Sequence, residues 1–260
     1  MNAIATLKKY AFNAYFLGFS IALFTFSETA FSTDLSSSNW FYDLHYYNYS
    51  EPSAGVTDNS RLPALSLGYR NNQVLKNSYD FKQITGNYEF AFIPTTYNGS
   101  GTSSSYYTKF LAEIYLPIRN TTYLGLGYRN HYDHSGFGTT STGYAGYDRQ
   151  SQYLYLPIGA YYSTTYGSFK TQYNYLIQGK QTSYFSQISG YANNIQNMQK
   201  NGYGLDFSYT PSTSKYEVYW RYWNIGDSDS DASYLSGGTL NGYYYEPANK
   251  TNEFGIRLAF

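Results

Sequence analysis

The sequence predicts an all-β protein, an antiparallel up-and-down β-barrel of about ten strands that crosses a membrane. The chain falls into segments of about ten residues in which apolar and polar side chains alternate, the period of a strand with two different faces. Short turns and long polar loops separate these segments alternately, which is typical of membrane barrels. The 260 residues include 36 Tyr and 17 Phe, and aromatic side chains suit surfaces that meet both hydrocarbon and water.

Charged residues are few and balanced, with 17 basic and 17 acidic side chains. No run of Lys and Arg indicates a nucleic-acid surface, so nucleic acid is not an expected partner. The chain contains no Cys, which excludes disulfides, thiolate metal sites, a cysteine nucleophile and a lipoprotein anchor. We expect no cofactor.

Residues 1–32 are interpreted as a cleaved secretory signal, in which Lys8 and Lys9 precede an apolar core and small residues stand at the cleavage spacing. The alternative is a permanent membrane helix, because the apolar run approaches the ~20 residues that span a bilayer. Residues 33–260 are expected to form a single barrel domain. They contain no second apolar stretch of that length, so strands have to carry the chain across a membrane.

Alternation places ten strands along the chain. They are 40–49, 62–70, a segment within 81–94, 107–118, 122–131, 152–162, 168–181, 202–210, 216–224 and 251–260. Eight strands are the alternative if the first and third are not strands. An odd number is not expected, because the two chain ends of such a barrel would lie on opposite sides of the membrane.

Seven of these segments show an apolar set of residues two positions apart. In chain order these sets include Leu65, Leu67 and Tyr69; Tyr88, Phe90 and Phe92; Phe110, Ala112, Ile114 and Leu116; Leu154, Leu156 and Ile158; Tyr173, Tyr175 and Ile177; Leu205, Phe207 and Tyr209; and Phe254, Ile256, Leu258 and Phe260. In the strand 168–181 the opposite set is Gln172, Asn174 and Gln178. The long loops are expected at 51–61, 97–105, 132–149, 182–201 and 225–250, facing out of the cell.

The last strand resembles the closing strand of Gram-negative outer-membrane β-barrels, whose terminal aromatic residue is part of what their assembly machinery reads. Here that residue is Phe260. The resemblance implies a bacterial outer-membrane location after secretion to the periplasm. It also implies contact with outer-membrane lipid, lipopolysaccharide and the barrel-assembly machinery. Trp40, Trp220 and Trp223, with the many Tyr residues near strand ends, are expected to form interfacial girdles.

If the apolar set of each strand faces lipid, the other set faces the lumen. Its charged and histidine members are Asp43, His45, Arg70, Glu89, Lys109, Glu113, Arg129, His131, Asp206, Glu217, Arg221, Glu253 and Arg257. Charges removed from water need partners, and a barrel of ten strands is narrow enough for side chains to fill. We therefore expect a salt-bridged plug; the alternative is a narrow conduction path lined by the same charges.

Two short motifs suggest chemistry. His131, Asp133 and His134 stand where a strand leaves the membrane, and such groups can act as metal ligands or as a general base. The strand number and this position resemble the omptin outer-membrane proteases, but the order and spacing of the residues differ. Asp227, Asp229 and Asp231 have the spacing of half a calcium loop, yet Ala232 and Gly238 replace the Gly and Glu that an EF-hand requires. A flexible acidic loop is the simpler interpretation.

Gly125 and Gly127 lie inside a strand rather than before a helix, so we expect them to relieve crowding rather than to bind phosphate. Taken together, the sequence favours a non-enzymatic surface protein, an adhesin or a structural barrel, whose loops contact extracellular ligands. A small-solute channel is the first alternative. A rim-located hydrolase acting on peptides or lipopolysaccharide is the second.

Overall fold

The computed structural model describes residues 39–73, 84–118, 121–212 and 214–260. The predicted signal segment lies outside these residues, so its cleavage remains a prediction. In this part of the chain no helix combines the length and the apolar character needed to span a membrane. The unit that contains the described residues runs from Ser38 to Phe260.

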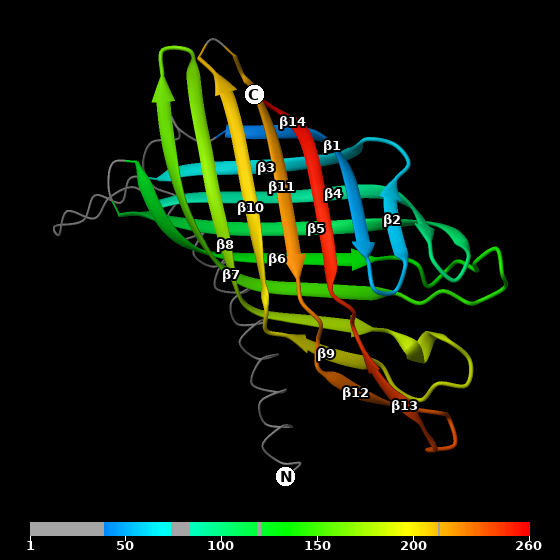
Figure 1. Cartoon of the computed structure of the whole chain (residues 1–260). Helices are drawn as coiled ribbons and strands as arrows, with labels where there is room; N and C mark the ends of the chain where they lie inside the picture. The colour runs from blue at the N-terminus through cyan, green and yellow to red at the C-terminus, as the bar shows by residue number, and fades with distance from the viewer. Residues whose placement is uncertain (1–38, 74–83, 119–120, 213) are drawn as a thin grey trace. The chain divides into compact units, whose positions relative to one another are not determined.

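Ten strands close into one antiparallel barrel (Figure 1). Each pairs with the next, and the last pairs with the first. The predicted fold class and strand number are therefore confirmed. The strands are β1 (Asn39–Glu51), β3 (Ala64–Gln73), β4 (Ile84–Asn98), β5 (Thr102–Pro117), β6 (Thr122–Asp133), β7 (Arg149–Thr164), β8 (Gly167–Ser183), β10 (Gly202–Pro211), β11 (Tyr216–Ile225) and β14 (Asn249–Ala259).

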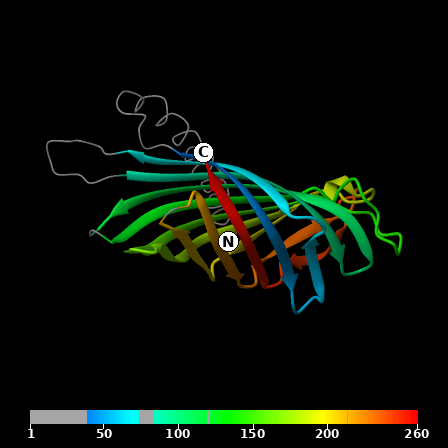
Figure 2. The ribbon, with the colours of Figure 1, turned by 90° about the horizontal axis from the view of Figure 1, so that it is seen from above.

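The strands tilt strongly, so those of the near wall, β10, β11 and β14, cross those of the far wall in Figure 1. We call the end of the barrel that carries residues 134–148, 184–201 and 226–248 the loop end. The opposite end, with the tight connections β7–β8 and β10–β11, is the turn end. Figure 2 shows the same barrel from above.

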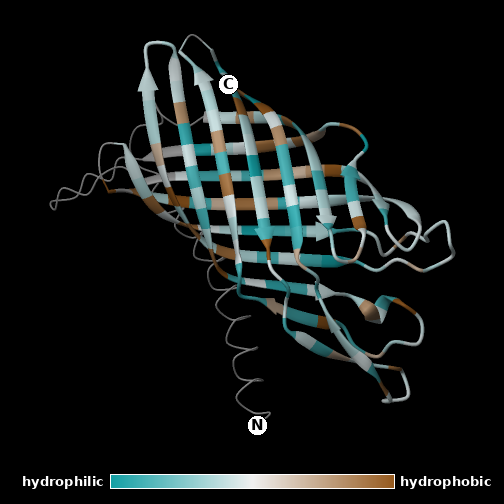
Figure 3. Ribbon diagram, viewed as in Figure 1, coloured by the Kyte–Doolittle hydropathy of each residue, from teal (hydrophilic) through white to brown (hydrophobic). Residues whose placement is uncertain are grey.

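The two faces of each strand follow the period-two pattern. On β1, Phe41, Asp43, His45, Tyr47 and Tyr49 point inward and are buried. The residues between them form an apolar outer row, with exposures of 48% to 61%, and are Trp40, Tyr42, Leu44 and Tyr46. The same alternation of polar and apolar bands runs along the other barrel strands (Figure 3). Apolar side chains in such numbers on the outside of a polar interior are the inverse of a soluble protein.

The apolar belt ends at polar pairs on the side of the loop end. Asn48 of β1 lies opposite Asn252 of β14, and Asn130 of β6 lies opposite Gln152 of β7. Nearer the turn end than these pairs, Leu44 lies between Ile256 and Leu65 of the two neighbouring strands. The belt therefore covers the part of the strands nearer the turn end, and the strands continue beyond it toward the loop end.

Four further strands lie in regions predicted to be loops: β2 (Val56–Ser60), β9 (Ile195–Gln199), β12 (Ser230–Tyr234) and β13 (Leu240–Tyr245). A 3-10 turn covers Phe185–Gln187. The predicted loop 97–105 is a turn of three residues between β4 and β5. These predictions were wrong because beyond the belt the outer face of a strand meets water instead of lipid. Both faces then carry polar residues, although the inner face is buried, as Asp58 and Asn197 are, and the apolar-polar alternation disappears.

A bulge between β7 and β8 changes the two faces of β8. The register shifts between Leu154 and Tyr155, so that Tyr155 pairs with Leu176 while Leu154 pairs with Gln178. Leu176 is buried inside the barrel, and Gln178 joins the row of Leu154 on the outside. The predicted inward face of Gln178 is therefore wrong.

Gly125 and Gly127 of β6 are sites of close approach. A Cβ atom on Gly125 would lie 2.2 Å from the carbonyl oxygen of Ile114, and one on Gly127 would lie 2.2 Å from the ring of Tyr155. The expectation that these residues relieve crowding is confirmed. The absence of a side chain at Gly127 lets Tyr155 lie flat across β6 and reach the lumen.

Candidate functional site

The lumen contains a connected group of ion pairs that we call the central network. It consists of five acidic residues and five basic residues, namely Asp43, Glu89, Asp206, Glu217 and Glu253 with Arg70, Lys109, Arg129, Arg221 and Arg257. All ten are among the residues that alternation assigned to the lumen. The network is formally neutral, which matches the need of buried charges for partners.

Glu253 of β14 lies at the centre of this network. Its carboxylate accepts from Lys109 Nζ at 2.5 Å, from Arg221 Nη1 at 3.2 Å and from Arg129 Nη2 at 3.4 Å. Arg129 belongs to β6, and four strands separate β6 from β14 in either direction around the barrel. The contact between Arg129 and Glu253 therefore joins opposite walls across the lumen.

The remaining carboxylates extend the network toward both ends. The Glu89 carboxylate forms ion pairs with Lys109 Nζ at 2.8 Å and with Arg257 Nη2 at 3.1 Å. Glu217 is held by both guanidinium nitrogens of Arg70, at 2.7 and 2.8 Å, and by Arg257 at 2.6 Å. Asp206 accepts from Arg221 Nε at 2.7 Å, and Asp43 accepts from the Tyr219 hydroxyl at 2.7 Å.

Glu113, also predicted to face the lumen, is held differently. Its carboxylate accepts from the Tyr155 hydroxyl at 2.8 Å, from Gln172 Nε2 at 2.8 Å and from Asn87 Nδ2 at 3.2 Å. The Tyr115 hydroxyl also donates to it. Neutral donors thus replace the cation that a buried carboxylate usually needs.

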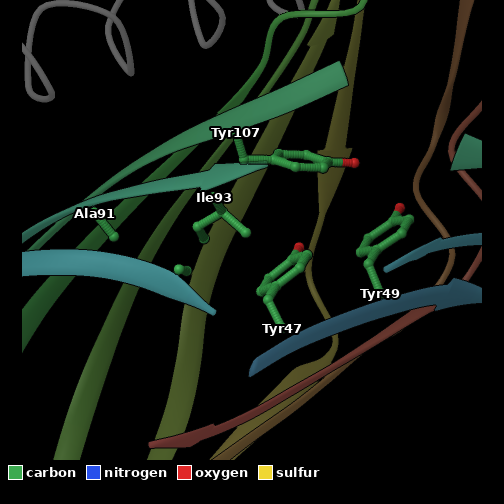
Figure 4. Packing of buried hydrophobic residues seen from close by; sticks show 6 residues of the cluster. Tyr47, Tyr49, Ala91, Ile93 and Tyr107 are labelled. Carbon is green, nitrogen blue, oxygen red and sulfur yellow. The ribbon is translucent and has the colours of Figure 1, made fainter. Parts of the chain in front are cut away.

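Aromatic side chains fill the lumen between the central network and the loop end. Tyr47, Tyr49 and Tyr107 pack with Ala91 and Ile93 (Figure 4). A second cluster consists of Tyr153, Tyr155, Leu176, Trp223 and Ile225. Trp223 is fully buried with its ring centroid 4.9 Å from that of Tyr155, so its predicted place in an interfacial girdle is wrong. Trp40 and Trp220 lie on the outer rows, as a girdle requires: Trp40 is 48% exposed, and Trp220 pairs with the exposed Phe207 and Phe254.

The turn end of the lumen is hollow. Two cavities of about 340 and 330 Å³ share Arg70, Thr210 and Glu217 in their walls. Phe260 lines the first of them and stacks on Tyr42 of β1, with ring centroids 4.7 Å apart. Its backbone N–H donates to the carbonyl of Trp40.

The structure does not bring the two predicted rim histidines together. His131 points inward, where its ring stacks on Tyr107 at 4.3 Å and its Nδ1 lies 3.3 Å from the Tyr47 hydroxyl. His134 stacks instead on Tyr106, in the outward row of β5, at 4.4 Å. Asp133 points inward. Residues three apart along an extended chain face opposite sides, and this parity already separates the two histidines.

The three aspartates of the predicted calcium half-loop serve as backbone acceptors. Asp227 accepts the N–H of Ala248 at 2.6 Å, Asp229 that of Met198 at 2.6 Å and Asp231 that of Gln196 at 2.9 Å. Across the described ranges, no group of three or more His, Cys, Asp or Glu side chains could hold a metal ion. Asp229 and Asp231 therefore tie the segment 226–248 to β9, and Asp227 links the two ends of the segment.

A second charged group, which sequence reasoning missed, lies inside the barrel at the loop end. We call it the outer cluster: Glu51, Asp58, Asp133, Arg149 and Glu246. Arg149 Nη1 donates to Glu51 at 2.9 Å, and Arg149 Nε donates to Asp133 at 3.3 Å. Glu246 lies 4.0 Å from the same guanidinium. The parity of β1, β6 and β7 continues to Glu51, Asp133 and Arg149, so longer strands would have revealed three of the five.

Burial changes the acidity of this cluster. It raises the pKa of Glu246 to about 8, an effect that Arg149 opposes and the charge of Glu51 reinforces. Burial, followed by the charge of Asp133, raises the pKa of Asp58 to about 6. Both groups therefore retain protons at a pH where an exposed carboxyl is ionised.

A closed antiparallel barrel, an apolar outer belt and a charged interior together define the class: the chain is a β-barrel of the outer-membrane kind, as predicted. Because the barrel is closed, the backbone N–H and C=O groups of each strand can pair with neighbouring strands, and no sheet edge is left unpaired in the membrane. The class rests on the barrel itself and on its two faces.

Comparison with protein-family models and with curated proteins found no match. Among solved structures, the chain is similar to the translocator domain of the autotransporter NalP from Neisseria meningitidis, at 11% identity and a TM-score of 0.42, over 97% of this chain and 98% of that one. It is similar to the β domain of the Bordetella autotransporter BrkA at 10% identity and a TM-score of 0.42, over 86% and 99%. For the transport unit of AIDA-I from Escherichia coli the values are 14% and 0.34, over 91% and 96%.

Proposed function

We propose that the protein is a non-enzymatic surface protein of the bacterial outer membrane, an adhesin or structural barrel with a closed lumen. The observation that carries the proposal is the central network, because its contacts join opposite walls and Glu253, Glu89, Lys109 and Arg129 are at most 1% exposed. The aromatic clusters and the outer cluster lie above it. Three successive layers of packed side chains oppose solute flow through the barrel.

The loop end offers a surface for contacts. The β12–β13 hairpin exposes Tyr243 by 71% and Tyr245 by 56%, beside half-exposed Tyr234 and Leu240. Tyrosines with a rigid ring and a polar tip form contact surfaces at low entropic cost. In this proposal the hairpin contacts extracellular ligands, the belt contacts lipid and lipopolysaccharide, and Phe260 contributes to recognition by the assembly machinery.

Planar-bilayer recordings test the closed lumen. The purified barrel is first identified by a shift between unboiled and boiled samples on a denaturing gel. We expect its insertion to give no discrete conductance steps in 1 M KCl. Uniform steps accompanying each insertion would contradict the closed lumen. They would favour the small-solute channel, the second candidate, which the two turn-end cavities support.

Attachment of expressing cells tests the surface role. We expect cells carrying the protein to attach to epithelial monolayers more than vector-only cells do, and Tyr243→Ser with Tyr245→Ser to remove at least half of that gain. Tyr162→Ser is the matched control, since Tyr162 is 67% exposed but lies at the turn end. Equal attachment with and without the protein, or an equal loss in the control, would count against the proposal. The variants are compared at equal amounts of folded barrel, which the gel shift measures.

A further inference from the structure

The outer cluster has an excess of acid that the central network does not have. Four carboxylates, Glu51, Asp58, Asp133 and Glu246, accompany the single cation Arg149. None of the four is more than 6% exposed. Because unpaired buried charges are costly, at least part of this cluster has to hold protons or a cation.

Arg149 is already committed to two of the carboxylates. It belongs to β7, and four strands separate β7 from β1 in either direction, so its contact with Glu51 crosses the mouth of the lumen. Its Nε donates to Asp133 on β6. Glu246, from the segment 226–248, lies at the limit of ion pairing, 4.0 Å from Arg149. The cation thus leaves Glu246 without a close ionic partner.

The contacts of the Tyr49 hydroxyl also indicate that Glu246 is protonated. It lies 2.7 Å from Glu51 Oε1 and 3.2 Å from Glu246 Oε1. A phenol has one proton, so it can donate to only one of these two carboxylates at a time. With Tyr49 donating to Glu51, the contact with Glu246 is a hydrogen bond only when Glu246 carries a proton and donates it to the phenol oxygen.

Among the residues that the structure describes, those around the cluster supply no second Lys or Arg to its carboxylates. Tyr107 of β5 donates to Asp58 at 2.8 Å, and Ser105 donates to Asp133 at 3.0 Å. The ionisable groups that face the cluster from the surrounding elements are Tyr49, Tyr97, Tyr107, His131, Tyr147 and Tyr153. Arg61, at the rim, donates to Ser104 and Ser105 instead of to a carboxylate.

We propose that the outer cluster is a proton-operated latch: a proton on Glu246 holds the segment 226–248 over the mouth of the lumen, and loss of that proton loosens it. The proposal rests on the closed barrel of the proposed function and adds the condition under which its loop end opens. Asp229 anchors the same segment to β9, whereas Asp227 accepts from Ala248 within the segment. Glu246 is the acid of this segment that approaches Arg149.

The direction of the pH dependence follows from the raised pKa of Glu246. A carboxyl whose pKa is higher in the closed state stabilises that state fully below its ordinary range, near 4.5, and loses this contribution as the pH rises to about 8. The smaller rise for Asp58, to about 6, acts in the same direction at lower pH. The latch is therefore strongest in acid and weakest above pH 8.

Thiol labelling tests the latch, because the chain has no cysteine of its own. Thr251→Cys places a thiol in the lumen between the outer cluster and the central network, where Thr251 is 2% exposed. The protein in lipid vesicles is treated with a membrane-impermeant maleimide. Its labelling rate is divided by that of Ser236→Cys, an exposed site of the same loop, which removes the pH dependence of the reagent.

We expect this ratio to rise on the order of tenfold between pH 5.5 and pH 9. In the Glu246→Gln background most of this rise should disappear, because an amide cannot ionise and only the smaller contribution of Asp58 remains. Asp227→Asn, in the same segment but outside the cluster, should keep the rise. A flat ratio in the parent, the same rise in Glu246→Gln, or its loss in Asp227→Asn overturns the latch. Each variant is first checked for the gel shift of a folded barrel.

Two additions separate the possible failures. Calcium chloride at 5 mM and pH 9 should not restore protection of Thr251→Cys; if it does, the cluster binds a metal cation and the proton assignment is wrong. Bilayer recordings at pH 5.5 report on the central network independently. Conductance there refutes the closed lumen, whereas a silent barrel with flat labelling refutes the latch alone.

Discussion

Glu253→Gln is expected to lower the free energy of unfolding of the barrel by about 3–5 kcal/mol. The substitution keeps the shape of the side chain but removes the charge that three cations share. Lys109 retains Glu89, and Arg221 retains Asp206. Arg129 keeps no carboxylate among its contacts in the described structure, and its guanidinium is left buried over the rings of Trp223 and Tyr153.

Urea unfolding of the protein in lipid vesicles, followed by tryptophan fluorescence and by the gel shift, measures this loss. Arg129→Met in the Glu253→Gln background should recover at least half of it, because the orphaned charge is then gone and a double-mutant cycle isolates the coupling. Asp227→Asn, an exposed acid at the loop end, serves as the control and should change little. If Glu253→Gln and the control have equal midpoints, the central network does not stabilise the barrel.

Leu44→Arg is expected to cost about 2–4 kcal/mol in a bilayer, because it places a cation on the lipid face near the middle of the apolar belt. Leu44 is 56% exposed and lies between Ile256 and Leu65. Asn48→Arg, on the same row of the same strand but at the polar border, should cost only about 0–1 kcal/mol.

Unfolding of both variants in vesicles decides whether the belt meets lipid. An arginine on the surface of a water-soluble protein replaces an exposed leucine at little cost, so equal stabilities at positions 44 and 48 would refute the membrane assignment. The comparison is internal to one strand. It is therefore independent of how the reference stability is determined.

The ten barrel strands could be predicted because alternate residues face two different surroundings, the polar lumen on the inside and the apolar belt surface on the outside. On β1 the contrast between Leu44 outside and Asp43 inside is visible in the sequence alone. Beyond the belt the outer face meets water while the inner face stays buried among polar groups, so both faces are polar and that contrast disappears. Ser103 to Ser105 were therefore assigned to a loop although they belong to β5, and β2, β9, β12 and β13 were missed for the same reason.

The membership of the lumen set could be predicted, but its pairings could not. Lys109 and Glu253 are separated by 144 positions, and their contact depends on the tilt of the strands and on the reach of two side chains across the lumen. The bulge at Leu154 had no signal in the alternation and reversed the face of Gln178. The outer cluster was hidden because predicted strands ended two or three residues short of Glu51, Asp133 and Arg149.

The equal numbers of acids and bases in the central network have an electrical consequence. A transmembrane potential acts on net charge that can move, at about 2.3 kcal/mol per elementary charge per 100 mV. Five carboxylates and five cations that are paired with one another carry no net charge. A transmembrane voltage therefore exerts almost no net force on this part of the lumen. If the lumen is closed as proposed, the central network should therefore give no voltage-dependent opening at either polarity.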